Sequence, residues 1–141
     1  MTLEISTSSP ELKDLYKMAL LVREKSYSPY SGHKVGAAIL TTDGKIYTGC
    51  NVENSSFGAT VCAERVAVQK AVSEKGTITL KAVMVVTSAT PPWPPCGMCR
   101  QVLGEFGKNF SVHTANTEGN LETYSFQELF PEGFTPAHMK P

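Results

Sequence analysis

The chain has 141 residues, of which 41% are apolar and 18% charged, as in a soluble globular domain that buries its own core. Its 13 basic and 13 acidic residues cancel without any run of like charge, which argues against a nucleic-acid partner and favours a neutral small molecule. No segment resembles a signal peptide or a membrane span. We therefore predict one cytoplasmic domain over residues 1–141, with no membrane partner.

The first predicted element is a helix that begins after Ser9. Ser9 is a good N-cap, and Pro10 suits the first helical position. Apolar residues then recur at spacings of three and four, which predicts an amphipathic helix; they are Leu12, Leu15, Ala19 and Val22. Pro29 and Gly32 follow its end.

A β-hairpin is predicted next. Residues 34–42 and 45–52 flank Asp43-Gly44, a strong hairpin signal. The first of these strands is mostly small and apolar, which predicts burial on both faces and close approach of another backbone.

Residues 62–76 predict a second helix, which ends before Gly76. Its expected inner side is formed by Ala63, Val66, Ala67, Ala71 and Val72. The β-branched run at 79–89 then predicts a central strand.

The remaining elements complete a sheet covered by helices. Prolines in 91–95 end the preceding strand, and a helix is predicted from Cys96 to residue 106. Strands are predicted at 110–115 and 121–125, and Ser125 to Glu128 form a capping box for a short helix. This order predicts a three-layer α/β/α fold with a five-stranded mixed sheet.

Three of the four cysteines lie where helices begin. Cys62 starts the second helix, whereas Cys96 and Cys99 start the third. Helix N-termini favour thiolate over thiol, so two such ends meeting at one point would hold a soft divalent metal. Zinc fits best, one ion per chain, because three protein ligands leave a fourth position open for water.

Glu64 and Arg65 follow Cys62 directly. A carboxylate so close to a ligand can act on the water without binding the metal, as a general acid and base. Arg65 could donate hydrogen bonds to thiolate sulfurs and offset their negative charge.

Simpler interpretations stay open at this point. Cys50 could complete a closed Cys₄ site, which would make the zinc structural and the chain a non-catalytic, zinc-stabilised interaction domain. Cys96 and Cys99 could form a redox pair, although neither Cys62 nor the proline-rich approach belongs to that pattern. Glu64 could be an ordinary first-turn acid.

Five segments resemble the small zinc-dependent cytidine deaminases, and together they cover nearly the whole chain. They are YSPYSGHKVGAAI, GCNVENSSF, CAER, PCGMCRQ and ELFPEGF. The CAE and PCGMC segments match the [HC]-x-E…P-C-x-x-C pattern of zinc deaminases. The resemblance implies hydrolytic deamination of cytidine or 2′-deoxycytidine in pyrimidine salvage, with zinc on Cys62, Cys96 and Cys99 and with Glu64 as the proton shuttle.

The same resemblance implies substrate contacts and an assembly. Asn51 and Glu53 would contact the ribose, and the backbone N–H of Ala63 would face the pyrimidine 2-oxo group. Small deaminases of this kind are usually homotetramers, in which a C-terminal aromatic, here Phe134, reaches a neighbour's active site.

Two positions depart from the family pattern. His33 stands where a phenylalanine commonly lines the pocket near the pyrimidine and ribose, and Phe57 stands where tyrosine is frequent. An imidazole adds a hydrogen-bond donor and acceptor to the pocket. His33 therefore supports an alternative substrate, a related aminopyrimidine nucleoside.

Overall fold

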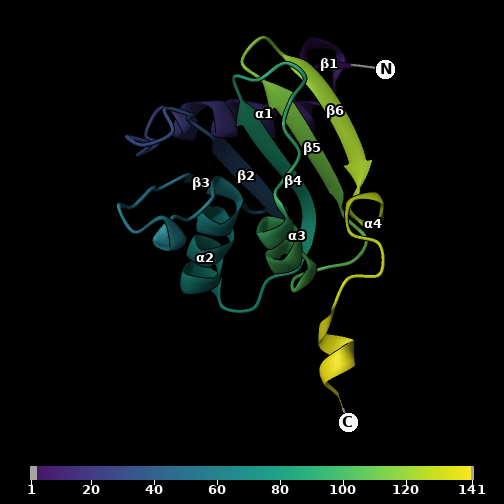
Figure 1. Cartoon of the computed structure of the whole chain (residues 1–141). Helices are drawn as coiled ribbons and strands as arrows, with labels where there is room; N and C mark the ends of the chain where they lie inside the picture. The colour runs from purple at the N-terminus through teal and green to yellow at the C-terminus, as the bar shows by residue number, and fades with distance from the viewer. Residues whose placement is uncertain (1–2, 141) are drawn as a thin grey trace.

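A computed structural model describes residues 3–140 of the chain (Figure 1). The strands are β1 (Leu3–Glu4), β2 (Gly36–Thr41), β3 (Ile46–Cys50), β4 (Leu80–Thr87), β5 (Ser111–Asn116) and β6 (Asn120–Ser125). The α-helices are α1 (Pro10–Arg23), α2 (Ala63–Lys75), α3 (Gly97–Gly104) and α4 (Phe126–Leu129). Short 3₁₀ turns are η1 (Ile5–Thr7), η2 (Phe57–Ala59) and η3 (Pro136–Met139).

The strands form one mixed sheet in the order β1-β6-β5-β4-β2-β3. β4 and β5 are parallel, and the other neighbouring pairs are antiparallel. The five predicted strands and the mixed sheet are therefore confirmed. The two-residue β1, which pairs with β6 through Leu3 and Leu121, adds a sixth strand at one edge.

Helices cover both faces of the sheet, which confirms the three layers (Figure 1). α1 packs on one face, where Leu15 and Ala19 join Ala38 and Met84 in a buried cluster. α2 and α3 pack on the other face, where a second buried cluster includes Ala67 and Leu103. β2 contributes to both clusters and is buried along its whole length, as its sequence predicts.

The inner side of α2 differs in part from the prediction. Val68 is buried, whereas Val66 is only partly buried and Val72 is 36% exposed. The buried residues Ala63, Ala67 and Ala71 mark the centre of the contact with the sheet. At 100° per residue, Val66 and Val68 lie equally far from Ala67 on opposite sides, and the buried Glu64 lies on the side of Val68. The buried face therefore extends towards Val68, and the choice of the two other valines was wrong.

Two glycines allow helices to approach the sheet closely. A Cβ on Gly36 of β2 would lie 2.0 Å from the carbonyl oxygen of Ala19 in α1. A Cβ on Gly49 of β3 would lie 2.4 Å from the backbone nitrogen of Ala67 in α2. Only glycine fits at such distances.

The loops that lead to the three N-terminal helix cysteines lie at one end of the strands. β3 and β4 run in the same direction because each is antiparallel to β2, which lies between them. Their carboxyl ends therefore lie at the same end of the sheet, and the loops that follow lead into α2 and α3. The segment before β2 reaches the same end, so three segments distant in sequence meet there.

The C-terminal segment leaves the body of the molecule after α4 (Figure 1). Ser125 and Glu128 form the predicted capping box, and the chain then runs to η3. Within residues 3–140, none of the helices has the length and apolar character needed to span a bilayer.

Candidate metal centre and active site

The sulfur atoms of Cys62, Cys96 and Cys99 lie within 4.8 Å of one another. Cys62 is the N-cap of α2, Cys96 is the N-cap of α3, and Cys99 lies in the first turn of α3. Cys99 is buried, whereas Cys62 is half-buried and Cys96 exposed. Cys50, in β3, does not belong to this cluster among the described residues.

The three sulfurs fit a zinc ion. Zinc–sulfur bonds of about 2.3 Å at tetrahedral angles place sulfurs about 3.8 Å apart. The sulfurs of Cys62 and Cys96 are 3.9 Å apart. Among residues 3–140 the cluster supplies three thiol ligands and no fourth, so it matches an open site rather than a closed structural one.

The charges around the cluster favour a bound cation. A hydrogen bond from Cys99, helped by Arg65, lowers the pKa of Cys62 to about 5. The pKa of Cys99 is raised, first by its hydrogen bond to Cys62 and then by burial and the Glu64 carboxylate. Three adjacent thiols cannot all ionise without a compensating cation, so a divalent metal suits this cluster.

Glu64 is almost completely buried, with 4% of its surface exposed. Burial raises the pKa of its carboxyl group to about 7, and the nearby Cys62 adds to the rise. A carboxyl group with a pKa near neutrality is well suited to both accept and donate a proton.

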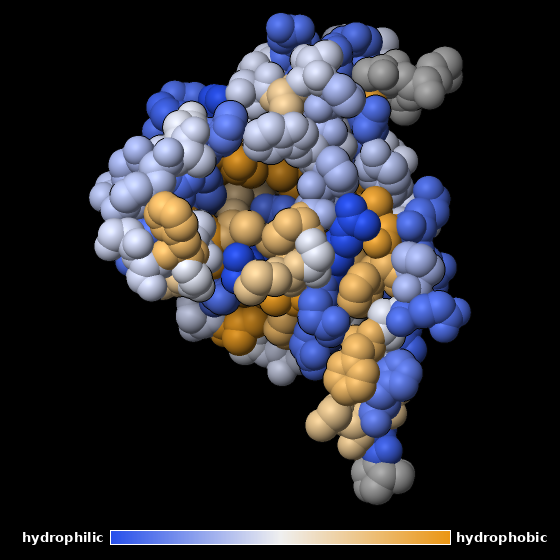
Figure 2. All heavy atoms as spheres, viewed as in Figure 1, coloured by the Kyte–Doolittle hydropathy of each residue, from blue (hydrophilic) through white to orange (hydrophobic). Residues whose placement is uncertain are grey.

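A pocket of about 270 Å³ brings Cys62 of the three-thiol cluster together with predicted substrate contacts. Its walls include the predicted site residues His33, Asn51, Glu53, Cys62, Ala63 and Glu64. Figure 2 shows a hollow with apolar side chains on the face that α2 and α3 cover. Ala63 begins α2, so its backbone N–H has no partner within the helix.

Asn51 is buried and braces the segment before β2. Its Nδ2 donates to the carbonyl of His33 at 2.8 Å, and its Oδ1 accepts from the backbone N–H of Val35 at 3.0 Å. The hydroxyl of Ser26 also donates to Oδ1. One amide hydrogen of Asn51 therefore remains for a ligand.

Glu53 is held as a carboxylate. The backbone N–H groups of Tyr30 and Ser31 donate to its Oε1 at 2.9 and 3.1 Å, and the Ser31 hydroxyl donates to Oε2. The Ser31 hydroxyl makes the largest contribution to lowering the pKa of Glu53. An ionised carboxylate accepts hydrogen bonds only, so Glu53 is suited to a hydroxyl donor.

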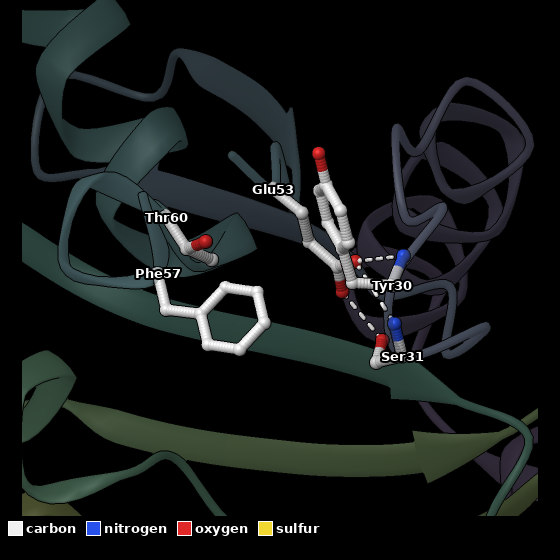
Figure 3. A pocket seen from close by; sticks show the side chains of 5 residues that line it. All are labelled: Tyr30, Ser31, Glu53, Phe57 and Thr60. Atoms are coloured by element: carbon white, nitrogen blue, oxygen red, sulfur yellow. Dashed lines mark hydrogen bonds between the residues drawn. The ribbon is translucent and has the colours of Figure 1, made fainter. Parts of the chain in front are cut away.

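A second pocket of about 370 Å³ adjoins the first and shares Ser31, Glu53 and Thr60 with it. Its aromatic walls are Tyr30 and Phe57, whose ring centroids are 5.6 Å apart in an edge-to-face arrangement (Figure 3). Phe57 is 73% exposed. The two pockets therefore lie side by side, and Glu64 lines the smaller one.

Phe134 is not among the residues of 3–140 that line either pocket of its own chain. It lies in the C-terminal segment, 55% exposed, and its ring stacks on His138. Gln101 of α3 donates to the Phe134 carbonyl at 2.9 Å. The neighbouring Arg100 donates to the carbonyls of Pro95 and Leu129, so α3 ties the C-terminal segment to the metal loop.

Arg65 contacts the cluster as its position predicts. Its Nη2 lies 3.4 Å from the sulfur of Cys62. Its Nε is buried and has no hydrogen-bond partner among the described residues.

Trp93 is an aromatic residue of the main pocket that the sequence analysis does not predict. It lines the main pocket with Pro94, and its ring packs edge-to-face with His33 at a centroid distance of 5.1 Å. Its position in the proline-rich segment, three residues before Cys96, was the sequence signal that could have placed Trp93 near the site.

Comparisons with known proteins agree with this fold and site. Residues 9–114 match the family described as the cytidine and deoxycytidylate deaminase zinc-binding region. A cytidine deaminase of Halalkalibacterium halodurans is 44% identical over 126 residues, which cover 89% of this chain and 95% of that protein. A cytidine deaminase of Sporosarcina psychrophila is 46% identical over 114 residues, which cover 80% of this chain and 83% of that protein.

Solved structures give the same result. The crystal structure of a cytidine deaminase from Burkholderia pseudomallei is similar with a TM-score of 0.82 and 42% identity, over 86% of this chain and 98% of that one. Fold, thiol cluster and buried carboxyl group together define a zinc-binding deaminase domain. The chain belongs to the cytidine and deoxycytidylate deaminase zinc-binding family.

Proposed function

We propose that the chain catalyses hydrolytic deamination of cytidine and 2′-deoxycytidine, giving uridine or 2′-deoxyuridine and ammonia. The observation that carries this proposal is one pocket whose walls include both Cys62 of the three-thiol cluster and the buried Glu64. The names of the relatives from H. halodurans and S. psychrophila support the choice of substrate.

Cys62, Cys96 and Cys99 would hold the zinc ion, with Arg65 beside them. When bound, zinc is a Lewis acid that makes water nucleophilic near neutral pH. Glu64 would accept a proton from the attacking water and deliver it to N3 of the pyrimidine. It would then take the proton of the new C4 hydroxyl and give it to the amine, which leaves as ammonia while the C4 carbonyl forms. Its burial removes competing solvent from these transfers.

The other pocket residues would bind and orient the nucleoside. The free N–H of Ala63 donates to the 2-oxo group, while Asn51 and Glu53 contact sugar hydroxyls. The carboxylate of Glu53 would repel a phosphate at that end of the pocket, which favours a nucleoside over a nucleotide.

A homotetramer is the assembly that we propose. Formal net charge is zero, so repulsion does not oppose self-association. Phe134 is exposed on a segment that leaves the body of the molecule, which suits a contact with a neighbour's active site (Figure 1). We also assign the enzyme to pyrimidine salvage in the cytoplasm, because clustered unpaired cysteines are typical of a reducing compartment.

A second candidate is a deaminase of a related aminopyrimidine nucleoside. His33 favours it, because an imidazole lines the pocket where the family commonly has phenylalanine. A non-catalytic interaction domain is a weaker alternative, since it leaves the buried Glu64 in the pocket without a role.

Purified protein with measured zinc content tests the proposal. Loss of ultraviolet absorbance is followed on cytidine, 2′-deoxycytidine, deoxycytidylate, cytosine and a ring-substituted cytidine. We expect turnover of the two unmodified nucleosides and little of deoxycytidylate. Preference for the substituted cytidine would favour the second candidate. Inactivity on every compound at full zinc content would contradict the proposal.

A further inference from the structure

His33 and Trp93 approach the pocket from different segments. His33 lies just before β2, and Trp93 lies in the loop that follows β4. Both line the main pocket, where the rings meet at a centroid distance of 5.1 Å and an interplanar angle of 73°. Trp93 remains 44% exposed. The pair therefore forms a continuous aromatic wall at the mouth of the pocket.

The backbone of His33 belongs to the hydrogen-bond cluster that contains Asn51 and Glu53. Its carbonyl accepts from the Asn51 amide, and its N–H donates to the Ser31 hydroxyl at 3.0 Å. The same Ser31 hydroxyl donates to Glu53. His33 is consequently fixed at the end of the pocket where the sugar is proposed to bind, and Trp93 supports its ring.

The ring nitrogens of His33 are available for hydrogen bonds to a ligand. Neither ring nitrogen of His33 makes a hydrogen bond within residues 3–140. A neutral imidazole offers one donor and one acceptor, so it can pair with a hydroxyl in either sense. Its neighbours are less versatile, because Glu53 only accepts and the Asn51 oxygen is already occupied.

We propose that His33 determines sugar specificity by hydrogen-bonding, through a ring nitrogen, a pentose hydroxyl that Asn51 and Glu53 do not bind. This inference rests on the proposed nucleoside deamination and narrows its substrate class to nucleosides that carry that hydroxyl. Trp93 acts as the positioning residue, because its ring packs against the imidazole.

Substitution His33→Phe tests the hydrogen bond while it keeps a ring against Trp93. Values of kcat/KM are measured on cytidine and on its 2′-, 3′- and 5′-deoxy analogues. For the analogue that lacks the bound hydroxyl, we expect the kcat/KM of wild type to be about three- to tenfold lower than on cytidine, the effect of one neutral hydrogen bond. On cytidine, the kcat/KM of His33→Phe should be lower than that of wild type by a similar factor. Removal of the hydroxyl should then lower the kcat/KM of His33→Phe no further. This non-additivity is the signature of a direct contact.

A binding measurement that does not depend on turnover is available, because Trp93 is the single tryptophan of the chain. Its fluorescence reports on the wall directly. Titration with uridine and its deoxy analogues gives dissociation constants for wild type and for His33→Phe, and these should show the same coupling. Zinc content and thermal unfolding establish that each variant is folded.

His113→Phe is the matched control. His113 lies in β5 on the face of the sheet that α1 covers, and its ring pairs with Thr123 at 2.9 Å, away from the pocket. The control should keep the wild-type discrimination among the sugars.

Equal discrimination by wild type and His33→Phe for all three analogues would overturn the inference. If wild type still deaminated cytidine, the proposed function would stand without it. A wild type that neither deaminates cytidine nor binds uridine would overturn both.

Discussion

The Nη2 atom of Arg65 lies 3.4 Å from the sulfur of Cys62, and the same guanidinium group reaches the carbonyl oxygen of Thr60. Arg65 follows the buried Glu64 in the first turn of α2, so the start of one helix carries a proposed metal ligand, the proposed proton shuttle and a cation. Three thiolates on a divalent ion leave one negative charge. We propose that the guanidinium group offsets that charge and keeps the cluster suited to activating water.

Substitution Arg65→Gln should weaken zinc binding about 10- to 100-fold, because the charge that faces the Cys62 thiolate is lost. Competition with a chromophoric chelator measures the affinity. The control is Lys70→Gln, an exposed cation on the same helix, which should bind zinc like wild type. Equal affinity of the Arg65 variant and wild type would contradict the role given to Arg65.

Alanine at Cys62, Cys96 or Cys99 should each remove the zinc, since two remaining thiols cannot hold it tightly. Cys50→Ala should retain one ion per chain, because Cys50 lies outside the cluster. Elemental analysis of the four purified variants decides the ligand set. Zinc loss from the Cys50 variant to the same extent as from the others would refute the open site.

Gly49→Ala should destabilise the fold by about 3 kcal/mol, because the added Cβ would lie 2.4 Å from the nitrogen of Ala67 and 2.7 Å from the oxygen of Ala63. Both atoms belong to the backbone of α2, so the helix that presents Cys62 and Glu64 must shift. Chemical denaturation measures the loss. Gly58→Ala is the control, since its Cβ would meet nothing within 4 Å. Equal stability of the two variants would contradict the close packing of α2.

The ion pair between Lys75 and Asp43, at 2.6 Å, should give a pH-dependent contribution to stability. The hydrogen bond from Lys75, and next that from Thr41, lowers the pKa of Asp43 from 3.8 to about 2. The carboxylate therefore stabilises the fold above about pH 4, and the effect disappears as the pH falls towards 2.

Substitution Asp43→Asn should accordingly lower the Tm at neutral pH, with a gap from wild type that closes in acid and shrinks in high salt. Thermal unfolding across this pH range measures it. Asp14→Asn serves as the control, because Asp14 makes no ion pair among the described residues. A gap that is constant with pH would show that the ion pair is not its cause.

Local chemistry made much of the fold predictable from the sequence. Ser9 caps α1 by accepting from the N–H of Leu12, Asp43-Gly44 turns the hairpin, and Ser125 and Glu128 form the capping box. Each of these interactions joins residues within four positions of one another, so it can be predicted from a short stretch of sequence. The grouping of Cys62 with Cys96 and Cys99 was predictable because metal ligands share a recognisable spacing.

Contacts between distant segments were not predictable in the same way. The pairing of Leu3 with Leu121 depends on where the chain returns, and two residues carry no strand pattern of their own. Trp93 contacts His33 only because the loop after β4 and the segment before β2 lie at the same end of the strands. Val68 is buried rather than Val72 because the direction of α2 is set by its contact at Gly49.

The most direct test of the central claim compares cytidine turnover by wild type and Glu64→Gln at equal, measured zinc content. A buried carboxyl group that transfers protons should be worth at least about a hundredfold in kcat, while the amide keeps the shape of the pocket. Glu74→Gln, an exposed change on the same helix, should retain full activity. We predict zinc-replete, folded and inactive Glu64→Gln protein; cytidine deamination by this variant at the wild-type rate would contradict the account.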